Sequence, residues 1–434
     1  MIPSKRKITL LVAGIAGCLL TQSAYSANWL MLQGTETAKQ GQSPRAHVWG
    51  FIQAQYQYDN SDPSTVPNPA GGYVPPKLIG PNLDSQNQFN VNRARIGVRG
   101  TGLPLDSKVN YFILAEFGNN GITAPGGYNP ALTDASITLN HIPGARVRSG
   151  MFKYPGAEEG LQAIHVFDYI NFTSVTNQML LERFPQEGDT NAPPTPTPDA
   201  NMAQYSRSVG AFRDVGVQVF DAFKVNNWEH SYAIMVGNGN GLNFGDNDDN
   251  KDLYLYLSTE RIFGGKGGRR EGAKMFAWYQ DGKRTNANDR TQEQDRTRAG
   301  LGVKYLKKPF RATAEYMQGE GMIFQGQHRP LHIYNNLDAA GYYLEGGWYI
   351  ANTKWELDLR YDSYTREENH PTSNKGVDES TADTITVGTQ YHFNKKTRVN
   401  AEYASRDFKS DTAAVNTQQK DVDGRFAIQL THIF

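Results

Sequence analysis

Basic side chains recur at alternate positions of one short segment, residues 92–99. Arg93, Arg95 and Arg99 are separated by even intervals, and small or apolar residues occupy the positions opposite them. In a β-strand successive side chains point to opposite faces, so this spacing places three guanidinium groups on one face. A row of arginines is costly against lipid, whereas in water it attracts anions. The pattern therefore predicts a strand with one apolar face and one cationic face turned toward water.

Charged side chains occupy one face of several other segments that alternate in the same way. In a channel, such groups select solutes by the charge at the narrowest part. Opposite charges on neighbouring strands also form ion pairs that stabilise a sheet, and we expect this role for most of the set. The candidate channel-lining residues are, besides Arg93, Arg95 and Arg99, the residues Glu116, Asp134, Arg146, Arg148, Asp214, Arg298, Lys304, Arg311 and Arg360. The same rule adds Glu315, Lys354, Glu356, Asp358, Arg398, Glu402 and Arg406.

Sixteen segments with a period of two form the expected framework of the chain. The connections between them alternate between long and short, which is typical of a barrel with tight periplasmic turns and long extracellular loops. We therefore predict an all-β fold, a transmembrane antiparallel up-and-down β-barrel of 16 strands, with 18 as the alternative count. The expected strands lie near 46–58, 87–100, 107–118, 131–141, 145–153, 209–221, 228–237, 251–259, 272–281, 297–306, 310–318, 340–350, 353–365, 382–393, 396–407 and 424–434.

Residues 1–27 are typical of a signal peptide. Lys5, Arg6 and Lys7 precede an apolar run, and small residues near Ala27 provide a cleavage site. A lipoprotein processing site at Cys18 is the alternative interpretation. Cys18 is the only cysteine, so the mature chain would lack disulfides, thiolate metal sites and cysteine nucleophiles. We expect export to the outer membrane of a Gram-negative cell.

Charge and hydropathy exclude two classes of protein. The chain has 44 basic and 44 acidic residues, and removal of the signal peptide leaves a net charge of −3, which argues against nucleic-acid binding. The mean hydropathy is −0.60, and no mature segment approaches the ~20 apolar residues of a membrane-spanning helix. We expect a short periplasmic N-terminal segment, 28–45, followed by a barrel in outer-membrane lipid, 46–434. The alternating apolar residues up to Phe434 resemble the final strand of outer-membrane proteins.

The longest connection, 154–208, contains more apolar and aromatic residues than a solvated loop requires. A barrel of this strand number encloses an aqueous channel unless a segment folds inward. We expect this loop to fold into the barrel and narrow it, with its Pro-rich stretch 193–198 outside. An external flap is the alternative.

Several stretches resemble the phosphate-selective porin O and P family. They are Arg-Ala-Arg-Ile-Gly-Val at 93–98, Gly-Met-Phe-Lys-Tyr-Pro at 150–155 followed by Glu158 and Glu159, the segment 173–183, Arg-Asp-Val-Gly-Val at 213–217, and Asn-Gly-Asn-Gly at 238–241. The resemblance implies a trimeric barrel that conducts small ions, in some members preferring phosphate or related anions through lumenal arginines and lysines.

The resemblance also implies, by matched position, that Arg93, Arg95 and Lys153 line the channel. Strict alternation places Lys153 on the face opposite Arg146 and Arg148, so its role depends on where the fifth strand ends. The chain departs from a phosphate-specialised member in two ways. Its loops contain no dense lysine cluster, and acidic residues offset many of the wall arginines.

Other motifs do not predict a reaction. Residues 245–250 lack the ligand spacing of a calcium site, so a hairpin tip is the preferred interpretation. The Gly-rich stretch 264–268 lacks the ending of a phosphate-binding loop. The nine histidines show no HExxH spacing, and no serine lies in a nucleophile-elbow motif. We therefore predict no catalytic residue, no metal ligand and no cofactor.

Three classes of function follow from these patterns. The leading expectation is a homotrimeric porin for passive diffusion of small hydrophilic solutes, with a mild preference for small anions such as phosphate. An outer-membrane enzyme would need a nucleophile and a base on its rim, and no motif offers them. The alternative is a structural or interaction barrel, such as a sheath for a redox partner or an adhesin scaffold, which should copurify with its partner.

Overall fold

A computed structural model describes most of the chain. The described residues are 29–32, 46–61, 83, 85–101, 106–123, 128–181, 210–242, 246, 248–265, 269–285, 293–325, 332–334, 337–368, 378–411, 413 and 422–434. The predicted signal peptide, 1–27, and the Pro-rich stretch, 193–198, lie outside these residues. Statements about the fold refer to the described part of the chain.

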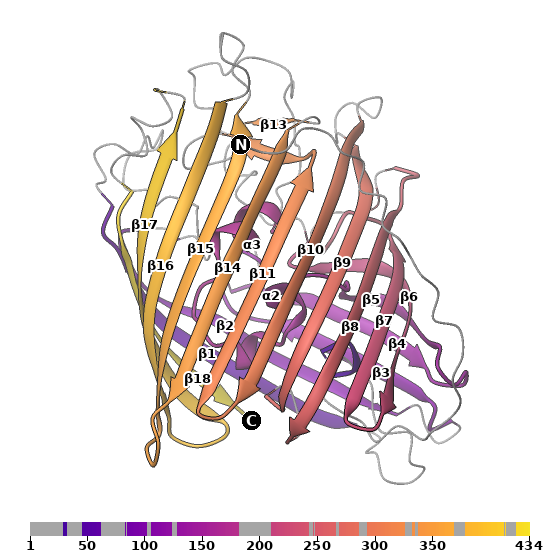
Figure 1. Ribbon diagram of the computed structural model, residues 1–434. Helices are drawn as coiled ribbons and strands as arrows, with labels where there is room; N and C mark the ends of the chain where they lie inside the picture. The colour runs from indigo at the N-terminus through magenta and orange to yellow at the C-terminus, as the bar shows by residue number, and fades with distance from the viewer. Residues whose placement is uncertain are drawn as a thin grey trace.

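Sixteen antiparallel strands form a closed barrel (Figure 1). Each barrel strand pairs with the next one along the chain, and the last closes the barrel by pairing with the first. The predicted fold class and the count of 16 are confirmed. A count of 18 would require β12 (Ile323–Gln325) and β13 (His332–Tyr334) to join the barrel, but these two strands form a separate sheet. The barrel strands are β1 (His47–Asp59), β2 (Asn87–Thr101), β3 (Val109–Glu116), β4 (Ala131–Leu139), β5 (Arg146–Lys153), β6 (Arg213–Val225), β7 (Trp228–Gly237), β8 (Asp252–Gly264), β9 (Glu271–Thr285), β10 (Glu293–Lys307), β11 (Phe310–Glu320), β14 (Asp338–Tyr349), β15 (Trp355–Glu368), β16 (Asp378–His392), β17 (Thr397–Ser410) and β18 (Arg425–Ile433).

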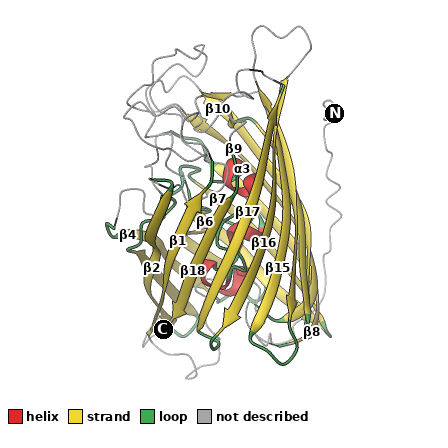
Figure 2. Cartoon of the chain, turned by 90° about the vertical axis from the view of Figure 1, so that its left-hand side faces the viewer, coloured by secondary structure: helices red, strands yellow, loops and turns green. Residues whose placement is uncertain are grey.

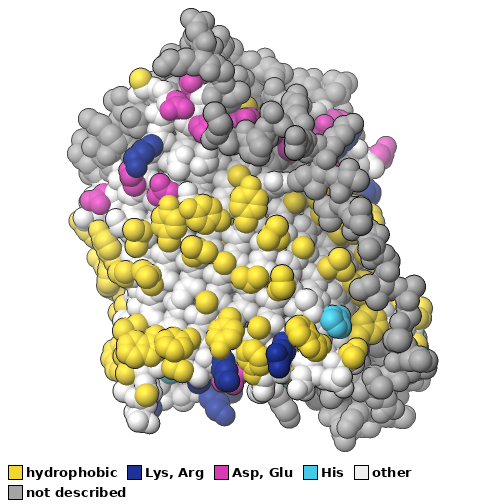
Figure 3. All heavy atoms as spheres, viewed as in Figure 1, with side chains coloured by type: hydrophobic (Ala, Val, Ile, Leu, Met, Phe, Trp, Pro, Cys, Tyr) yellow, Lys and Arg dark blue, Asp and Glu magenta, His cyan; other side chains and the backbone are white. Residues whose placement is uncertain are grey.

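The strands alternate between an apolar outer face and a polar inner face. On β18, Phe426, Ile428 and Leu430 are 38%, 38% and 46% exposed, whereas Gln429 and Thr431 are 3% and 1% exposed. This pattern is the inverse of that in a soluble protein, because an outer face of this kind meets lipid. On the side seen in Figure 3, hydrophobic side chains form a broad band across the wall. The exterior of the barrel is therefore suited to a membrane.

Aromatic side chains are exposed near the end of the barrel at which the connections are short. Among them are Trp228 beside the turn 226–227, Phe310 beside the turn 308–309, and Trp355 beside the turn 350–354. Aromatic rings favour the boundary between lipid and water, and short turns are typical of the periplasmic side. We therefore refer to this end as the periplasmic end.

The two ends of the barrel sequence meet along one seam. The backbone N–H of Phe434 donates to the carbonyl of Gly50 at 3.0 Å, and a Cβ atom at residue 50 would lie 2.4 Å from the Phe434 ring. Glycine is required there because the ring and the Arg95 carbonyl oxygen, also at 2.4 Å, occupy the side-chain space. At the other end of the seam, Asp59 lies 2.8 Å from Arg406 and 3.1 Å from Arg425, and these three side chains are fully buried.

Short helices lie inside the barrel, as Figure 2 shows. They are α2 (Glu158–Leu161), the 3-10 helix η2 (Ile164–Val166) and α3 (Ser174–Met179), and most residues of 154–181 are buried. We call residues 154–181 the inner loop. A further turn, α1 (Trp29–Leu32), is buried with them in one apolar cluster. Within the described part of the chain, every helix is too short or too polar to cross a membrane.

The structure differs from the sequence predictions at several strand ends and at one predicted wall residue. Strands β9 and β10 extend to Thr285 and from Glu293, well past the predicted limits of 272–281 and 297–306. Lys354, predicted to line the wall, is exposed in the turn before β15. That prediction was wrong because the turn extends through residue 354, where Thr353 accepts a hydrogen bond from the N–H of Trp355.

Candidate functional site

The inner loop is attached to the barrel wall through its own backbone. The N–H groups of Ile170 and Asn171 donate to the Glu402 carboxylate at 2.8 Å and 3.2 Å. The N–H of Ser174 donates to Asp362 at 2.7 Å. Glu402 belongs to β17 and Asp362 to β15, so two carboxylates of the wall hold the loop rather than face open solvent.

Carbonyl groups of the inner loop face basic side chains of the wall. Each bond satisfies a buried backbone oxygen and a buried cation at the same time. The bonds run from Lys153 to Gly160 and Gln162 at 2.7 Å and 2.6 Å, from Arg298 to Met179 at 3.1 Å, from Arg360 to Asn171 at 2.9 Å, and from Arg398 to Phe167. The loop is therefore held from several sides of the barrel.

Glu158, at the start of α2, joins the loop to the wall strands β9, β10 and β11. Its N–H donates to the Glu315 carboxylate at 3.1 Å, and its own carboxylate lies 2.5 Å from Lys274 and 2.9 Å from Lys304. Burial raises the pKa of Glu158, but attraction by the two lysines outweighs burial and lowers the pKa to about 2. The carboxylate is therefore ionised at neutral pH and offsets charge from the lysines.

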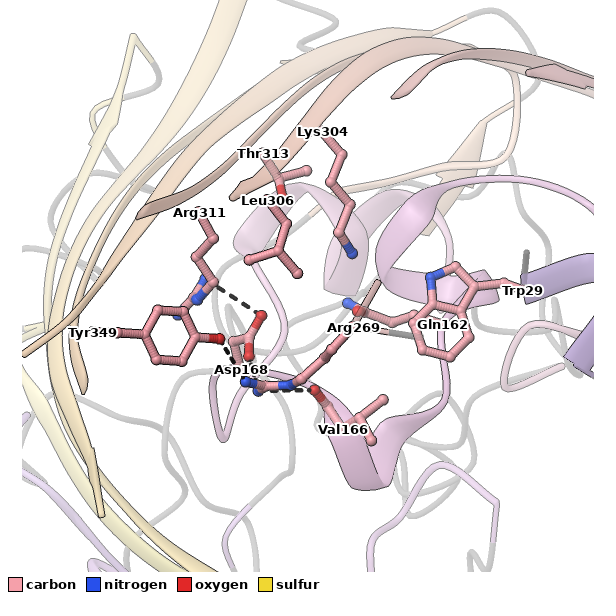
Figure 4. A pocket seen from close by; sticks show the side chains of 10 residues that line it. All are labelled: Trp29, Gln162, Val166, Asp168, Arg269, Lys304, Leu306, Arg311, Thr313 and Tyr349. Atoms are coloured by element: carbon pink, nitrogen blue, oxygen red, sulfur yellow. Dashed lines mark hydrogen bonds and ion pairs between the residues drawn. The ribbon is translucent and has the colours of Figure 1, made fainter. Parts of the chain in front are cut away.

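A second carboxylate of the inner loop, Asp168, lies between two arginines (Figure 4). Arg311 is 3.3 Å from Asp168, and Arg269 donates to it from the other side. Burial raises the pKa of Asp168, but attraction by Arg269 and Arg311 lowers it below its ordinary value. These residues line a small cavity with Lys304 and Trp29. The cavity lies toward the periplasmic end.

A second small cavity lies toward the opposite end of the barrel. Arg213, Arg284 and Arg296 line it, together with Tyr154 and Leu180 of the inner loop. Both cavities thus border the inner loop, and each is lined by three basic side chains. A solute that crosses the barrel beside the inner loop meets basic groups on both sides of it.

Arg93, Arg95, Lys153 and Arg213 form a basic cluster on the wall from β2 to β6. The four cations are close enough to repel one another. Two of them have carboxylate partners, because Arg95 lies 2.6 Å from Glu116 and Arg213 lies 3.0 Å from Asp134.

The other two cations of the basic cluster are bound by neutral oxygens. Arg93 donates to the side-chain oxygen of Gln53 at 3.1 Å. Lys153 donates to the two loop carbonyls described above. The basic cluster therefore combines four cations with two partner carboxylates, which leaves a local excess of positive charge beside the inner loop.

The predicted channel-lining residues face the barrel interior but fall into separate groups. The first group is the basic cluster with its partner carboxylates, and the second contacts the inner loop. The first contains Arg93, Arg95, Glu116, Asp134 and Lys153, and the second contains Arg298, Lys304, Arg311 and Arg360 as well as Lys153. The other predicted residues have partners of their own. Arg146 pairs with Asp221 at 3.1 Å, and Asp214 accepts hydrogen bonds from the Gly239 N–H and the Tyr254 hydroxyl. Arg148 contacts α1, and Arg99 is only half-buried.

Strict alternation wrongly placed Lys153 on the face opposite Arg148. The strand does extend to Lys153, but alternation fails at its last two residues, because Phe152 and Lys153 are both buried. Gly150 of the same strand adopts a φ of 125°. A Cβ atom at residue 150 would lie 2.1 Å from the carbonyl oxygen of Ala135, so only glycine allows this backbone path.

Sequence reasoning missed several basic residues of the site. Arg284 and Arg296 lie beyond the expected ends of their strands, and Arg269 follows a Gly-rich stretch interpreted as a flexible turn. Arg213 precedes Asp214, so alternation allowed only one of them to face inward, yet both are buried. Arg284 lies four residues after Gln280, and this even spacing is consistent with a strand that continues to residue 284.

Nothing in the described geometry assembles a metal centre. No group of three or more His, Cys, Asp or Glu residues in that part of the chain could hold a metal ion. A closed barrel of sixteen strands, apolar outside and lined by charged groups inside, is the architecture of an outer-membrane porin, a channel for small solutes. Residues 80–430 match the model of the family described as phosphate-selective porin O and P, and the chain belongs to this family.

Several solved structures have a similar fold. An anion-selective porin from Comamonas acidovorans is 13% identical with a TM-score of 0.54, and the match covers 91% of this chain and 100% of that one. The outer membrane channel DcaP of Acinetobacter baumannii is 13% identical with a TM-score of 0.53, covering 93% and 100%. Salmonella typhi OmpF, in complex with daunomycin, is 14% identical with a TM-score of 0.55, covering 90% and 97%. No curated protein matches the chain. The family and the fold place the protein in the outer membrane as a channel.

Proposed function

We propose that this porin conducts small hydrophilic solutes with a mild preference for anions. The observation that carries the proposal is the basic cluster, in which Arg93 and Lys153 are bound by neutral oxygens while Arg95 and Arg213 have carboxylate partners. Positive charge in excess at a narrow, weakly hydrated place lowers the barrier for anions and raises it for cations.

The preference is expected to be mild because charge in the barrel is otherwise balanced. Among the described residues, buried carboxylates are nearly as numerous as buried basic side chains. Most of the basic groups near the periplasmic cavity also have acidic partners, such as Glu356 at 2.5 Å from Arg311. Selectivity therefore depends on the basic cluster rather than on the charge of the whole wall.

Three further features belong to the same proposal. We infer that residues 1–27 are removed as a signal peptide, that the mature chain functions without a cofactor or catalytic residue, and that three copies assemble, as the family resemblance suggests. The charge and spacing of residues 1–27 support the first inference. The mass of the purified protein and its assembly size in detergent test the first and third.

The anion preference is tested by the reversal potential of the purified porin in planar bilayers under a KCl gradient. We expect the wild-type potential to report anion preference, and Arg93→Gln and Lys153→Gln each to shift it toward cations. Recordings in chloride, phosphate and a short dicarboxylate would then rank the permeating anions.

Lys307→Gln is the matched control, because Lys307 is exposed on the outer surface next to Phe263 and carries the same charge. It should leave the reversal potential unchanged. A wild-type channel that prefers cations, or an Arg93→Gln channel with the wild-type reversal potential, would contradict the proposal.

A further inference from the structure

The turn α1 lies inside the barrel but belongs neither to the wall nor to the inner loop. Trp29, Leu30 and Met31 are 6%, 1% and 6% exposed, and all three belong to the apolar cluster that includes the inner loop. A helical turn of four residues has no stability of its own in water. Specific contacts must therefore hold this segment in the lumen.

Those contacts join α1 to charged groups of the loop and the wall. The indole N–H of Trp29 donates to Glu158 at 3.0 Å, and the Lys304 ammonium lies 5.8 Å from the centre of the indole ring. Arg148 donates to the carbonyl oxygen of Leu30 at 3.2 Å. Each interaction uses a different group of α1, so they fix its position and its orientation.

The anchors of α1 lie near the periplasmic end. Arg148 is two residues from the start of β5, which follows a short connection, and Lys304 is three residues from the end of β10, which precedes the turn 308–309. Trp29 also lines the periplasmic cavity, where it lies across from Arg311 in Figure 4. The segment thus lies in the lumen near the periplasmic end and borders this cavity.

We propose that Trp29–Leu32 is a tethered plug that restricts ion flow at the periplasmic side of the inner loop. Its apolar side chains exclude water from part of the lumen. Its Leu30 carbonyl oxygen accepts a hydrogen bond from the Arg148 guanidinium. Release of the plug would open the periplasmic cavity and widen the path for ions. The inference goes beyond the anion preference, because it concerns the width of the path rather than the sign of the charge that passes.

Single-channel recording of Trp29→Ala tests the plug. Loss of the indole removes the bond to Glu158 and the contact with Lys304 but changes no charge. We therefore expect conductance to rise about twofold with an unchanged reversal potential, since a wider path carries more current at the same selectivity. Mass spectrometry of the purified variant confirms that its chain begins at the same residue as the wild type.

Trp228→Ala is the control, because Trp228 is 44% exposed on the outer surface at the same end of the barrel. It should keep the wild-type conductance. Heat-modifiable migration of both variants on gels establishes that each barrel is closed. A folded Trp29→Ala barrel with wild-type conductance would overturn the plug.

Thiol accessibility gives a readout that does not depend on current. In a Cys18→Ala background, Met31→Cys should react with a hydrophilic maleimide more slowly than Ala351→Cys, which is exposed in a periplasmic turn. Adding Trp29→Ala should bring the rate at residue 31 close to that at residue 351. Equal rates at the two positions with Trp29 present would show that α1 does not occupy the lumen.

Discussion

Individual side chains of the wall position the inner loop as well as line the lumen. Glu402 shows this dual role, because its carboxylate accepts from the backbone N–H groups of Ile170 and Asn171 and from the Asn171 side chain. The sequence identified Glu402 as inward-facing from the alternation of β17. Its partners could not be predicted, because they lie more than 230 positions away in the chain.

Glu402→Gln should loosen the middle of the inner loop. An amide has one acceptor oxygen and no charge, so the buried N–H groups of residues 170 and 171 lose part of their bonding, at a cost of about 1–3 kcal/mol for a donor left unpaired. We expect faster hydrogen exchange at these amides and noisier open-channel current. Glu293→Gln, at an exposed pair with Lys283, should change neither. Unaltered exchange in Glu402→Gln would show that the loop is held elsewhere.

Residue-level prediction failed where the backbone departs from regular alternation. Arg93 was predicted correctly to face inward, yet its neighbour Asn92 is also buried, because the pairing register shifts opposite Gln53 and Ala54. Lys153 also departs from alternation, because it is buried like its neighbour Phe152 at the end of β5. Such irregularities depend on tertiary contacts and leave little trace in local sequence, and they occur here beside the inner loop.

At the scale of elements, α3 packs against β14 at Gly341, a residue that has no side chain. A Cβ atom at Gly341 of β14 would lie 2.6 Å from a Val175 methyl group and 2.6 Å from the Ser363 carbonyl oxygen. This close approach lets the inner loop rest directly on the wall. The apolar content of 154–208 predicted a packed segment, but only the structure identifies the surface against which it packs.

Gly341→Ala should therefore displace α3 from β14. Because the new methyl group overlaps Val175, we expect faster hydrogen exchange across residues 174–179 and a changed single-channel conductance. Gly346→Ala is the control on the same strand, since its Cβ atom would meet only ordinary contact, 3.7 Å from the Arg311 carbonyl oxygen. Identical behaviour of the two variants would refute a role for the α3 contact.

For the whole molecule, closure of the barrel depends on the seam between β1 and β18. The sequence predicted a closed barrel from the alternating long and short connections and the terminal Phe434. It did not indicate the Asp59, Arg406 and Arg425 group, because Asp59 is the last residue of its strand and its partners lie on the final two strands. An ion group of this kind appears only once the two ends of the chain meet.

Asp59→Asn should destabilise the closed barrel. It leaves two fully buried arginines without their carboxylate, and removing one partner of a buried ion pair costs about 3–5 kcal/mol. We expect the variant to unfold at a lower temperature when followed by heat-modifiable migration. Asp407→Asn provides the control, because Asp407 is exposed on β17 and pairs only with Lys409 among the salt bridges of the described residues. Equal unfolding temperatures for the two variants would exclude a stabilising role for the seam group.

The attachment of the inner loop has a consequence for redesign of this pore. Backbone N–H and carbonyl groups make the bonds to Glu402, Asp362, Lys153 and Arg298, and every amino acid except proline supplies both groups. The position of the loop is thus encoded partly in the wall, and loop side chains other than those bonded to the wall, such as Glu158, Asp168 and Asn171, can be exchanged. A sensor pore could be retuned by substituting loop residues and keeping the wall unchanged.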